Sequence, residues 1–341
     1  MIDKLTLNST LDREEFLNLI SNITEDDKQY LFGQAMQARR RHYGNAVYLR
    51  GLIEFTNMCK RNCRYCGIRA ANKNADRYRL SNDEILSCCE NGYRLGFRTF
   101  VLQGGEDDYF TDDRLCGLVS EIKARYPDAA VTLSVGERPK NSYQRLFDAG
   151  ADRYLLRHET ASGRLYNQLH EEMSLSNRKQ CLYDLKEIGY QVGAGFMVGL
   201  PGQTDEDLVE DLVFLKELSP HMVGIGPFIP QKDTPLANEK SGTAEKTVLL
   251  LAVIRLLLPN VLLPATTALG TITPKGREMG LMAGANVLMP NLSPVSVRKK
   301  YSLYDGKICT GEEAAECLNC ISLRIKSCGL SPDMSRGDFK I

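Results

Sequence analysis

The sequence contains no tryptophan and only four histidines, its formal net charge is zero, and it lacks a long uninterrupted hydrophobic run. Its most apolar stretch, residues 248–258, contains Arg255 and stops at Pro259, so it predicts a buried helix rather than a membrane span. A balanced charge gives no reason to expect a polyanionic partner. The N-terminal residues show no secretory pattern. We therefore expect a cytoplasmic protein that binds neither nucleic acid nor membranes.

Cysteine, by contrast, is abundant. Eleven cysteines without a secretory pattern favour reduced thiols and metal ligands over a disulfide framework. Cys59, Cys63 and Cys66 fall within eight residues in the order C-x3-C-x2-C. Three thiolates this close suit an iron–sulfur cluster, and a four-iron cluster held by three cysteines keeps one iron open for a small molecule. The alternatives are a structural zinc site, whose ligands usually come as separated pairs, and buried unligated cysteines.

Strand-like and helix-like segments alternate after residue 45. This alternation predicts a parallel sheet with helices outside it, and eight strands are the number that closes a barrel. The expected strands are residues 47–55, 99–103, 130–134, 153–157, 192–198, 222–225, 261–266 and 286–289. An open doubly wound sheet is the alternative, because a pattern alone does not prove closure.

Helix-start signals accompany this pattern. Residues 11–42 predict two amphipathic helices, the first capped by Ser9 or Thr10. Ser81 and Glu84 form a capping box at the start of the helix that follows the first strand of the sheet.

Several unusual residues follow the expected strands, at the end of a parallel barrel where ligands bind. Gln103, Gly104, Gly105 and Glu106 follow the second strand, and two glycines allow close approach of a ligand to the backbone. The other positions are Ser134, Arg157, His158, Glu159, Thr266 and Thr267. Arg157 suits a carboxylate, which the two threonines would help to hold, and Glu159 suits two ribose hydroxyls. The alternative is an internal salt bridge among Arg157, Glu137 and Glu159.

A second group of cysteines lies near the end of the sequence. Cys309, Cys317 and Cys320 form a C-x7-C-x2-C pattern in an otherwise polar segment. This pattern predicts a second metal site, with ordinary thiols as the alternative.

The first cysteine group resembles the signature of the radical S-adenosylmethionine (SAM) enzymes. In that superfamily the open iron of a 4Fe–4S cluster chelates SAM, and an aromatic residue such as Tyr65 precedes the third cysteine. Further strings resemble the HydE family of FeFe-hydrogenase maturases, which belongs to the same branch as biotin synthase and methylornithine synthase. These strings are residues 77–79, 101–107, 154–160, 197–204, 223–230, 234–239, 265–268 and 284–287.

The resemblance implies a complete (β/α)8 TIM-type barrel over residues 46–308. Residues 1–45 would be an N-terminal helical extension, and residues 309–341 would close the barrel and carry an accessory cluster, 2Fe–2S or 4Fe–4S. The implied SAM-binding residues are Tyr65, Gly104, Gly105, Glu106, Ser134, Glu159 and Arg178. The implied substrate-binding residues are Gln103, Arg157, Thr266, Thr267, Met289 and Tyr304.

The resemblance also implies a reaction. SAM would be cleaved to methionine and a 5′-deoxyadenosyl radical, which acts on a cysteine-bound Fe(CO)2(CN) precursor of the hydrogenase cluster. Other hydrogenase maturation proteins and an electron donor would be partners. A methylornithine synthase-like rearrangement of an amino-acid-like substrate is the alternative, and it would alter only the cavity. A plain iron–sulfur carrier would need the cysteines but not Gly104, Gly105, Glu159 or Arg178.

Overall fold

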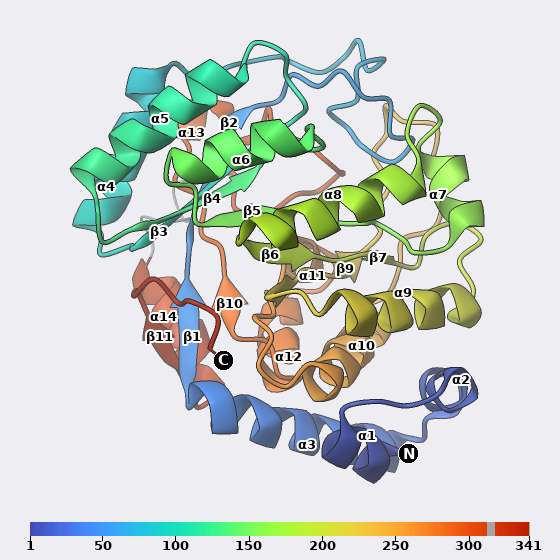
Figure 1. Cartoon of the computed structure of the whole chain (residues 1–341). Helices are drawn as coiled ribbons and strands as arrows, with labels where there is room; N and C mark the ends of the chain where they lie inside the picture. Colours follow the sequence, from blue (N-terminus) through green and yellow to red (C-terminus); the bar gives the residue numbers. More distant parts are fainter. Residues whose placement is uncertain (312–317, 341) are drawn as a thin grey trace.

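The computed structural model describes residues 1–311 and 318–340. Figure 1 shows strands near the centre of the molecule and helices around them. The helices are α1 Ile2–Asn8, α2 Arg13–Asn22, α3 Glu25–Tyr43, α4 Asn82–Arg94, α5 Asp112–Arg125, α6 Lys140–Asp148, α7 Gly163–Leu169, α8 Leu175–Ile188, α9 Asp205–Leu218, α10 Ala244–Leu257, α11 Thr267–Ile272, α12 Gly276–Met282, α13 Val295–Arg298 and α14 Leu318–Ser327. The strands are β1 Ala46–Leu49, β2 Gly51–Thr56, β3 Thr99–Gly104, β4 Ala130–Ser134, β5 Arg153–Leu155, β6 Gln191–Ala194, β7 Met197–Val198, β8 Met222–Val223, β9 Gly226–Pro227, β10 Val287–Leu288 and β11 Ser331–Asp333.

The alternating α/β architecture predicted from the sequence is confirmed. Six parallel strands form one sheet in the order β2-β3-β4-β5-β6-β8. Each is followed by a helix on the outside, as α4 follows β2 and α5 follows β3 (Figure 1). The strands are almost entirely buried, as expected when both faces of a parallel sheet are covered.

The ring is not closed by continuous ladders among the described residues. Between β8 and β2 it runs through three single bridges: Met222 to Leu262, Pro264 to Val287, and Asn291 to Leu52. The expected seventh strand, residues 261–266, is therefore present only as isolated bridges. Pro264 has no N–H to donate, and the N–H of Leu263 donates to the side chain of Asn286 at 2.8 Å instead of to a strand.

The expected fifth strand is divided at Gly195. This residue has a φ of +149°, and a Cβ there would lie 1.9 Å from the carbonyl oxygen of Gly224. Only glycine accepts both conditions. The chain therefore leaves the main sheet after β6 and pairs again as β7 with β9, above the sheet's C-terminal edge.

The N-terminal helices lie along the lower edge in Figure 1, beside α10 and α12. The prediction that Ser9 or Thr10 caps the helix after residue 11 is wrong. Asp12 caps α2 in a capping box with Glu15, and Ser9 ends the additional helix α1 with a φ of 51°. The capping box of Ser81 and Glu84 at α4 is confirmed.

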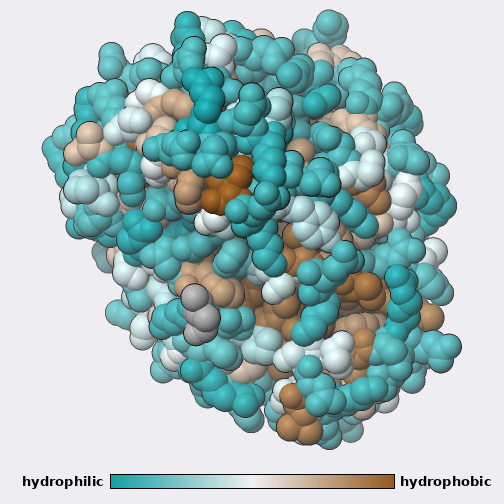
Figure 2. Space-filling model, viewed as in Figure 1, coloured by the Kyte–Doolittle hydropathy of each residue, from teal (hydrophilic) through white to brown (hydrophobic). Residues whose placement is uncertain are grey.

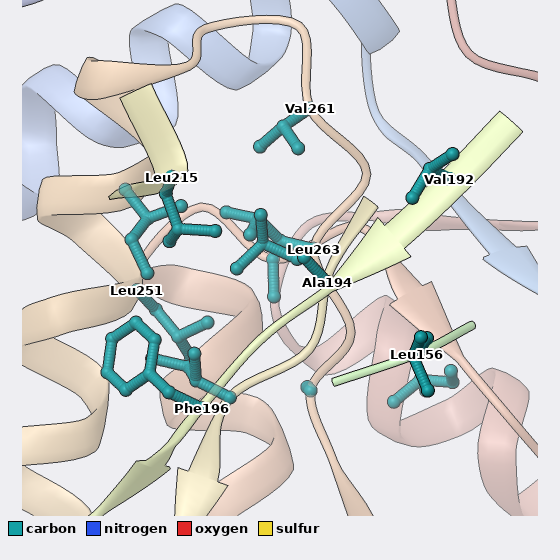
Figure 3. Packing of buried hydrophobic residues seen from close by; sticks show 14 of the residues in the cluster. Leu156, Val192, Ala194, Phe196, Leu215, Leu251, Val261 and Leu263 are labelled. Carbon is teal, nitrogen blue, oxygen red and sulfur yellow. The ribbon is translucent and has the colours of Figure 1, made fainter. Parts of the chain in front are cut away.

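The core lies between the sheet and the outer helices. Figure 3 shows Val192, Ala194 and Phe196 on and after β6, with Leu215 of α9 and Leu251 of α10 on the helix side. All five side chains are buried. The visible outer face in Figure 2 is mostly hydrophilic, with small groups of hydrophobic residues. In the described ranges no helix combines the length and the apolar character that crossing a bilayer requires.

Residues 331–340 lie against the N-terminal ends of the strands. β11 pairs in parallel with β1, from Ala46–Ser331 to Tyr48–Asp333. Arg153, at the start of β5, is 2% exposed, donates to the carbonyl oxygen of Arg336 and pairs with Asp338 at 2.5 Å. The tail thus covers the end of the sheet opposite to the one where the cysteine group follows β2.

Candidate active site

A cavity of about 390 Å³ lies at the C-terminal ends of the strands. All six residues predicted to bind substrate line it: Gln103, Arg157, Thr266, Thr267, Met289 and Tyr304. Five of those predicted to bind SAM line it as well: Tyr65, Gly104, Ser134, Glu159 and Arg178. Cys66 also faces this space, whereas Gly105 and Glu106 are outside its lining. The tertiary structure therefore brings together residues that are up to 239 positions apart, from Tyr65 to Tyr304.

The cysteine loop follows β2 directly and is attached to the loop after β3. The N–H of Lys60 donates to the carbonyl oxygen of Glu106 at 2.9 Å. Within the cysteine loop, the N–H of Cys66 donates to the carbonyl oxygen of Cys63 at 3.2 Å. A Cβ on Gly105 would lie 2.2 Å from the carbonyl oxygen of Met58 and 2.6 Å from the Cβ of Cys59. A side chain at residue 105 would therefore displace the first cysteine of the group.

The three cysteines of this loop are free thiols. All three, Cys59, Cys63 and Cys66, are half-buried. Burial raises the pKa of all three thiols, that of Cys63 to about 12, so iron would have to displace a proton from each. Residues 1–311 and 318–340 contain no three Cys, His, Asp or Glu side chains grouped to hold a single metal ion. A four-iron cluster instead accepts each cysteine on a different iron.

Tyr65 is held by a histidine that lies outside the cysteine group. Its hydroxyl lies 3.1 Å from Nε2 of His170, and the His170 ring stacks on Tyr166 with centroids 4.2 Å apart. Burial lowers the pKa of His170 to about 3, so the ring is neutral. The sequence analysis assigned no role to His170, because a single histidine after a helix is common and indicates no particular function.

Ion pairs order the wall formed by the loops after β3, β4 and β5. Arg178 is 7% exposed, and its Nε lies 2.6 Å from Oε1 of Glu137. Arg157 pairs with Glu159 at 2.7 Å. The salt-bridge alternative is thus confirmed for Arg157 and Glu159 but not for Glu137, which is paired with Arg178. Arg178, on α8, is buried rather than solvated.

Glu106 faces away from the cavity. Its Oε2 lies 2.6 Å from Nε of Arg61, and its Oε1 accepts from the N–H of Glu137 at 3.0 Å. The side chain therefore joins the cysteine loop to the loop after β4. The Glu106 carboxylate is thus fully engaged within the protein, and of the Gly-Gly-Glu segment only Gly104 lines the cavity.

Glu159 has an uncommon backbone conformation, with a φ of 66°. A non-glycine residue in this region is under strain unless its neighbours hold it. The buried His158 is 3.1 Å from Asp211 through Nε2 and accepts from the N–H of Gly195 through Nδ1. Asp211 also accepts from the N–H of Ala161. These bonds hold the residues on both sides of Glu159 and aim its carboxylate into the cavity.

A polar group on another wall was missed by the sequence analysis. Buried Glu54, on β2, lies 2.5 Å from Nζ of Lys307 and accepts from Nδ2 of Asn291 at 2.8 Å. Nε2 of Gln103 is 3.4 Å from the hydroxyl of Tyr301. The sequence did contain one indication of a role for Glu54, since it is an acidic residue within an otherwise apolar strand.

The accessory cysteines are only partly described. Cys309 is free, has a φ of 62°, and its Sγ lies 3.1 Å from Nη2 of Arg277 at the cavity. Cys320, exposed on α14, is disulfide-bonded, contrary to the expectation of a reduced thiol that ligates a metal. Cys317 lies outside the described residues, so the grouping of the three stays a prediction.

The Radical SAM superfamily model matches residues 53–215, a segment that carries the cysteine group and Glu159. The chain is 48% identical over 335 residues to the [FeFe] hydrogenase maturase subunit HydE of Thermotoga maritima, covering 97% of this chain and 96% of that protein. The chain belongs to the HydE family of radical SAM enzymes.

Other relatives of this HydE-family chain are more distant. It is 29% identical over 332 residues to 3-methylornithine synthase of Methanosarcina acetivorans, covering 97% of this chain and 93% of that one. A crystal structure of methylornithine synthase (PylB) superposes with a TM-score of 0.85 at 26% identity, covering 97% of each chain. The maturase HydG from Carboxydothermus hydrogenoformans shares the fold, with a TM-score of 0.81 at 20% identity over 98% of this chain and 78% of that one. For this family, a 4Fe–4S cluster and SAM are the implied cofactors.

Proposed function

We propose that this radical SAM maturase acts on a cysteine-bound Fe(CO)2(CN) complex during assembly of the FeFe-hydrogenase cluster. The observation that carries the proposal is the joint lining of one cavity. Residues predicted for SAM and residues predicted for substrate border the same space of about 390 Å³, beside Cys66. This volume suits a small molecule or metal complex next to a cofactor.

In this proposal the loop after β2 holds the cluster, and residues at the ends of β3, β4 and β5 and on α8 hold SAM. Cys59, Cys63 and Cys66 would hold the cluster, which would supply the reductive cleavage of bound SAM. Arg178 neutralises the SAM carboxylate, and Glu159 accepts hydrogen bonds from the ribose hydroxyls. Gly104, Gly105 and the backbone at Glu106 receive the methionine amino group, while Tyr65 and Ser134 border the nucleoside.

The remaining lining residues position the substrate. Arg157 contacts it from the wall next to Glu159, and Thr266 and Thr267 contact it from the start of α11. Gln103, Met289 and Tyr304 complete the enclosure. The enclosing walls keep water from a reactive radical, which would otherwise be quenched in side reactions.

A second candidate function is a rearrangement of an amino-acid-like substrate. It is favoured by the similarity to methylornithine synthase, at 29% identity and with a TM-score of 0.85 to a PylB structure. The higher identity to HydE, 48%, favours the maturase reading.

The experiment is an anaerobic assay of SAM cleavage by the reconstituted protein with a reductant. Adding a synthetic cysteine-bound Fe(CO)2(CN) complex should speed formation of adenosyl products by about tenfold or more, because substrate captures the radical. L-Lysine, an amino acid without iron, is the comparison ligand for the alternative reaction. The variant with Cys59, Cys63 and Cys66 all changed to alanine is the control and should cleave no SAM. Stimulation by lysine but not by the iron complex would reject the maturase proposal.

We also propose that Cys309, Cys317 and Cys320 hold a second cluster in the segment 309–341. Other maturation proteins and an electron donor are the proposed partners of the barrel, residues 46–308. Iron analysis of variants at the three cysteines tests the first of these proposals.

A further inference from the structure

Glu159 lies at the centre of a three-residue turn at the edge of the cavity. The N–H of Thr160 donates to the carbonyl oxygen of His158 at 2.8 Å, which closes the turn, and Glu159 has a φ of 66°. A turn of this kind with a positive φ at its centre is rare and is strained for a residue that has a side chain. Such a conformation persists only where the surroundings hold it, so the contacts around this turn carry information about its use.

The backbone of Glu159 is held by the segment that follows β6. Its N–H donates to the carbonyl oxygen of Gly195 at 3.0 Å, and its carbonyl oxygen accepts from the N–H of Met197 at 3.0 Å. The N–H of Gly195 donates in turn to Nδ1 of His158 at 3.3 Å. The side chain of His158 therefore fixes the same segment that fixes the backbone of Glu159.

The other ring nitrogen of His158 reaches Asp211, on α9. Because Nδ1 accepts a hydrogen bond, Nε2 carries the proton and donates to Oδ1 of Asp211, 3.1 Å away. Oδ1 also accepts from the N–H of Ala161 at 2.5 Å, on the far side of Glu159. Both side chains are fully buried, and neither lines the cavity. Burial lowers the pKa of His158 well below its usual range, which keeps the ring neutral, as this arrangement requires.

The carboxylate that the turn presents is only partly occupied. Oε2 of Glu159 lies 2.7 Å from Nη2 of Arg157, whereas Oε1 has no hydrogen-bond partner in the part of the chain that the structure describes. Glu159 lines the cavity, so one of its carboxylate oxygens is open to a ligand.

We propose that His158 and Asp211 are positioning residues that give this enzyme its preference for the SAM ribose, acting through Glu159. The proposal deepens the function proposed above and rests on the ribose role given there to Glu159. The pair holds the carboxylate in place before the ligand arrives, so little ordering cost remains to be met on binding. Without the pair, the strained turn relaxes to a negative φ and the carboxylate leaves its position, while the rest of the site is retained.

The proposal predicts that two buried side chains control one particular selectivity. The ligands are SAM and its 2′,3′-dideoxy analogue, which lacks both ribose hydroxyls and is otherwise identical. Binding of each is measured by anaerobic calorimetry on the reconstituted protein without reductant, so that neither ligand is cleaved. The wild type should prefer SAM by about tenfold or more, since hydrogen bonds to a charged carboxylate are lost with the analogue. Glu159→Gln should remove most of this preference.

Variants of the pair separate positioning from packing. His158→Phe keeps a ring against Phe196 and Phe214 but loses both hydrogen bonds. It should reduce the preference about as far as Glu159→Gln does, by weakening SAM binding while the affinity for the analogue stays the same. In a Glu159→Gln protein, adding His158→Phe should change the preference no further.

The variants of Asp211 provide a loss and a rescue. Asp211→Leu should act like His158→Phe, because it removes the acceptor of two hydrogen bonds. Asp211→Asn should keep most of the preference, since its amide oxygen accepts the same two bonds. Burial raises the pKa of the Asp211 carboxyl well above its usual range, so a neutral amide suits this place.

His221→Phe is the matched control. Nδ1 of His221 accepts from the N–H of Val192, on β6, at 2.9 Å, which is the same kind of bond that His158 makes to Gly195. Its ring contacts Phe339 of the C-terminal tail, at the end of the sheet away from the cavity. This variant should keep both affinities.

Two results would overturn the positioning role: a folded His158→Phe or Asp211→Leu protein that keeps the wild-type preference, or an equal loss of affinity for both ligands. Iron content and circular dichroism check that each variant is folded and loaded. A wild type without any preference would reject the ribose role of Glu159, and the positioning role with it. The measurement contains no iron complex. Failure of such a complex to stimulate SAM cleavage would therefore reject the proposed substrate and leave this result intact.

Discussion

The hydroxyl of Tyr65 donates a hydrogen bond to Nε2 of His170, at a distance of 3.1 Å. The direction of this bond follows from the other ring nitrogen. Nδ1 of His170 lies 3.3 Å from the carbonyl oxygen of Tyr166, which can only accept, so Nδ1 carries the proton and Nε2 accepts. The aromatic residue next to Cys66 is therefore held by a side chain about a hundred positions away in the sequence.

Removing this acceptor should weaken SAM binding. His170→Phe keeps a ring to stack on Tyr166 but leaves the Tyr65 hydroxyl unpaired. A typical buried hydrogen bond contributes about 1 kcal/mol, so SAM affinity should fall roughly fivefold. Titration of SAM into the reconstituted protein measures this. Tyr65→Phe should lose a similar amount, and the double variant should lose little more. Two fully additive losses would contradict a coupling between the two side chains.

The same histidine should make stability depend on pH. Unfolded histidine has a pKa of about 6.5, whereas burial lowers the pKa of His170 to about 3. Below pH 6.5 the unfolded chain binds a proton that the native protein does not, so native stability is lost as pH falls. This loss amounts to about 1.4 kcal/mol for each pH unit below 6.5.

His170→Phe should remove that contribution. Between pH 7.5 and pH 5.5 the free energy of unfolding should fall in both proteins. The fall should be larger in the wild type than in the variant, by about 1.4 kcal/mol. Denaturant unfolding of both proteins at the two pH values measures the difference. Parallel pH dependences for the two proteins would show that His170 is not buried in its neutral form.

The accessory cysteines should be dispensable for SAM cleavage. Cys309 contacts Arg277 rather than any residue predicted to bind SAM, and Cys320 is exposed on α14. Changing Cys309, Cys317 and Cys320 to alanine should lower the iron content and leave cleavage largely intact. Iron analysis and product quantification on the same preparation measure both effects. A folded variant that has lost SAM cleavage would place the second site in the reaction.

Arg157→Lys should impair substrate turnover more than SAM binding. Lysine keeps the charge but lacks the planar fork that contacts an anion through two bonds. The loss of one charge-assisted bond typically costs about 1.5–3 kcal/mol, or roughly one to two powers of ten. SAM affinity and substrate-dependent turnover are compared in the one variant. If SAM affinity collapses while substrate affinity is unchanged, Arg157 belongs to the SAM site.

Several features of the site were predictable because they depend on local sequence. The order of Cys59, Cys63 and Cys66 directly after an apolar strand indicated a cluster loop at a strand end, and the loop does follow β2. The strand expected over residues 47–55 is instead divided at Arg50 into β1 and β2, which belong to different sheets. Arg157, Thr266 and Thr267 were singled out because strand ends converge in a parallel barrel, whereas Met289 and Tyr304 came from the resemblance to the HydE family. The capping box at Ser81 and the order of strands and helices are likewise local signals.

Pairings between distant residues had no such signal. Whether Glu137 would meet Arg157 or Arg178 depended on how α8 packs, and the sequence could not distinguish these partners. The same holds for His170 beside Tyr65 and for Asp211 beside His158. In each case the charge or hydrogen-bonding group is common, and only its burial next to one partner gives it a role.

The family, the cluster loop and the alternation of strands and helices could be read from the sequence, because each is written in short-range spacing and periodicity. Only the tertiary structure shows how the ring closes and which cavity cations have a carboxylate partner among the described residues. The chain runs through single bridges near Pro264, where proline lacks an N–H, instead of forming a regular seventh strand. Arg157, Arg178 and Lys307 acquire their carboxylate partners only on folding, because charge balance depends on distances that the order of residues does not contain.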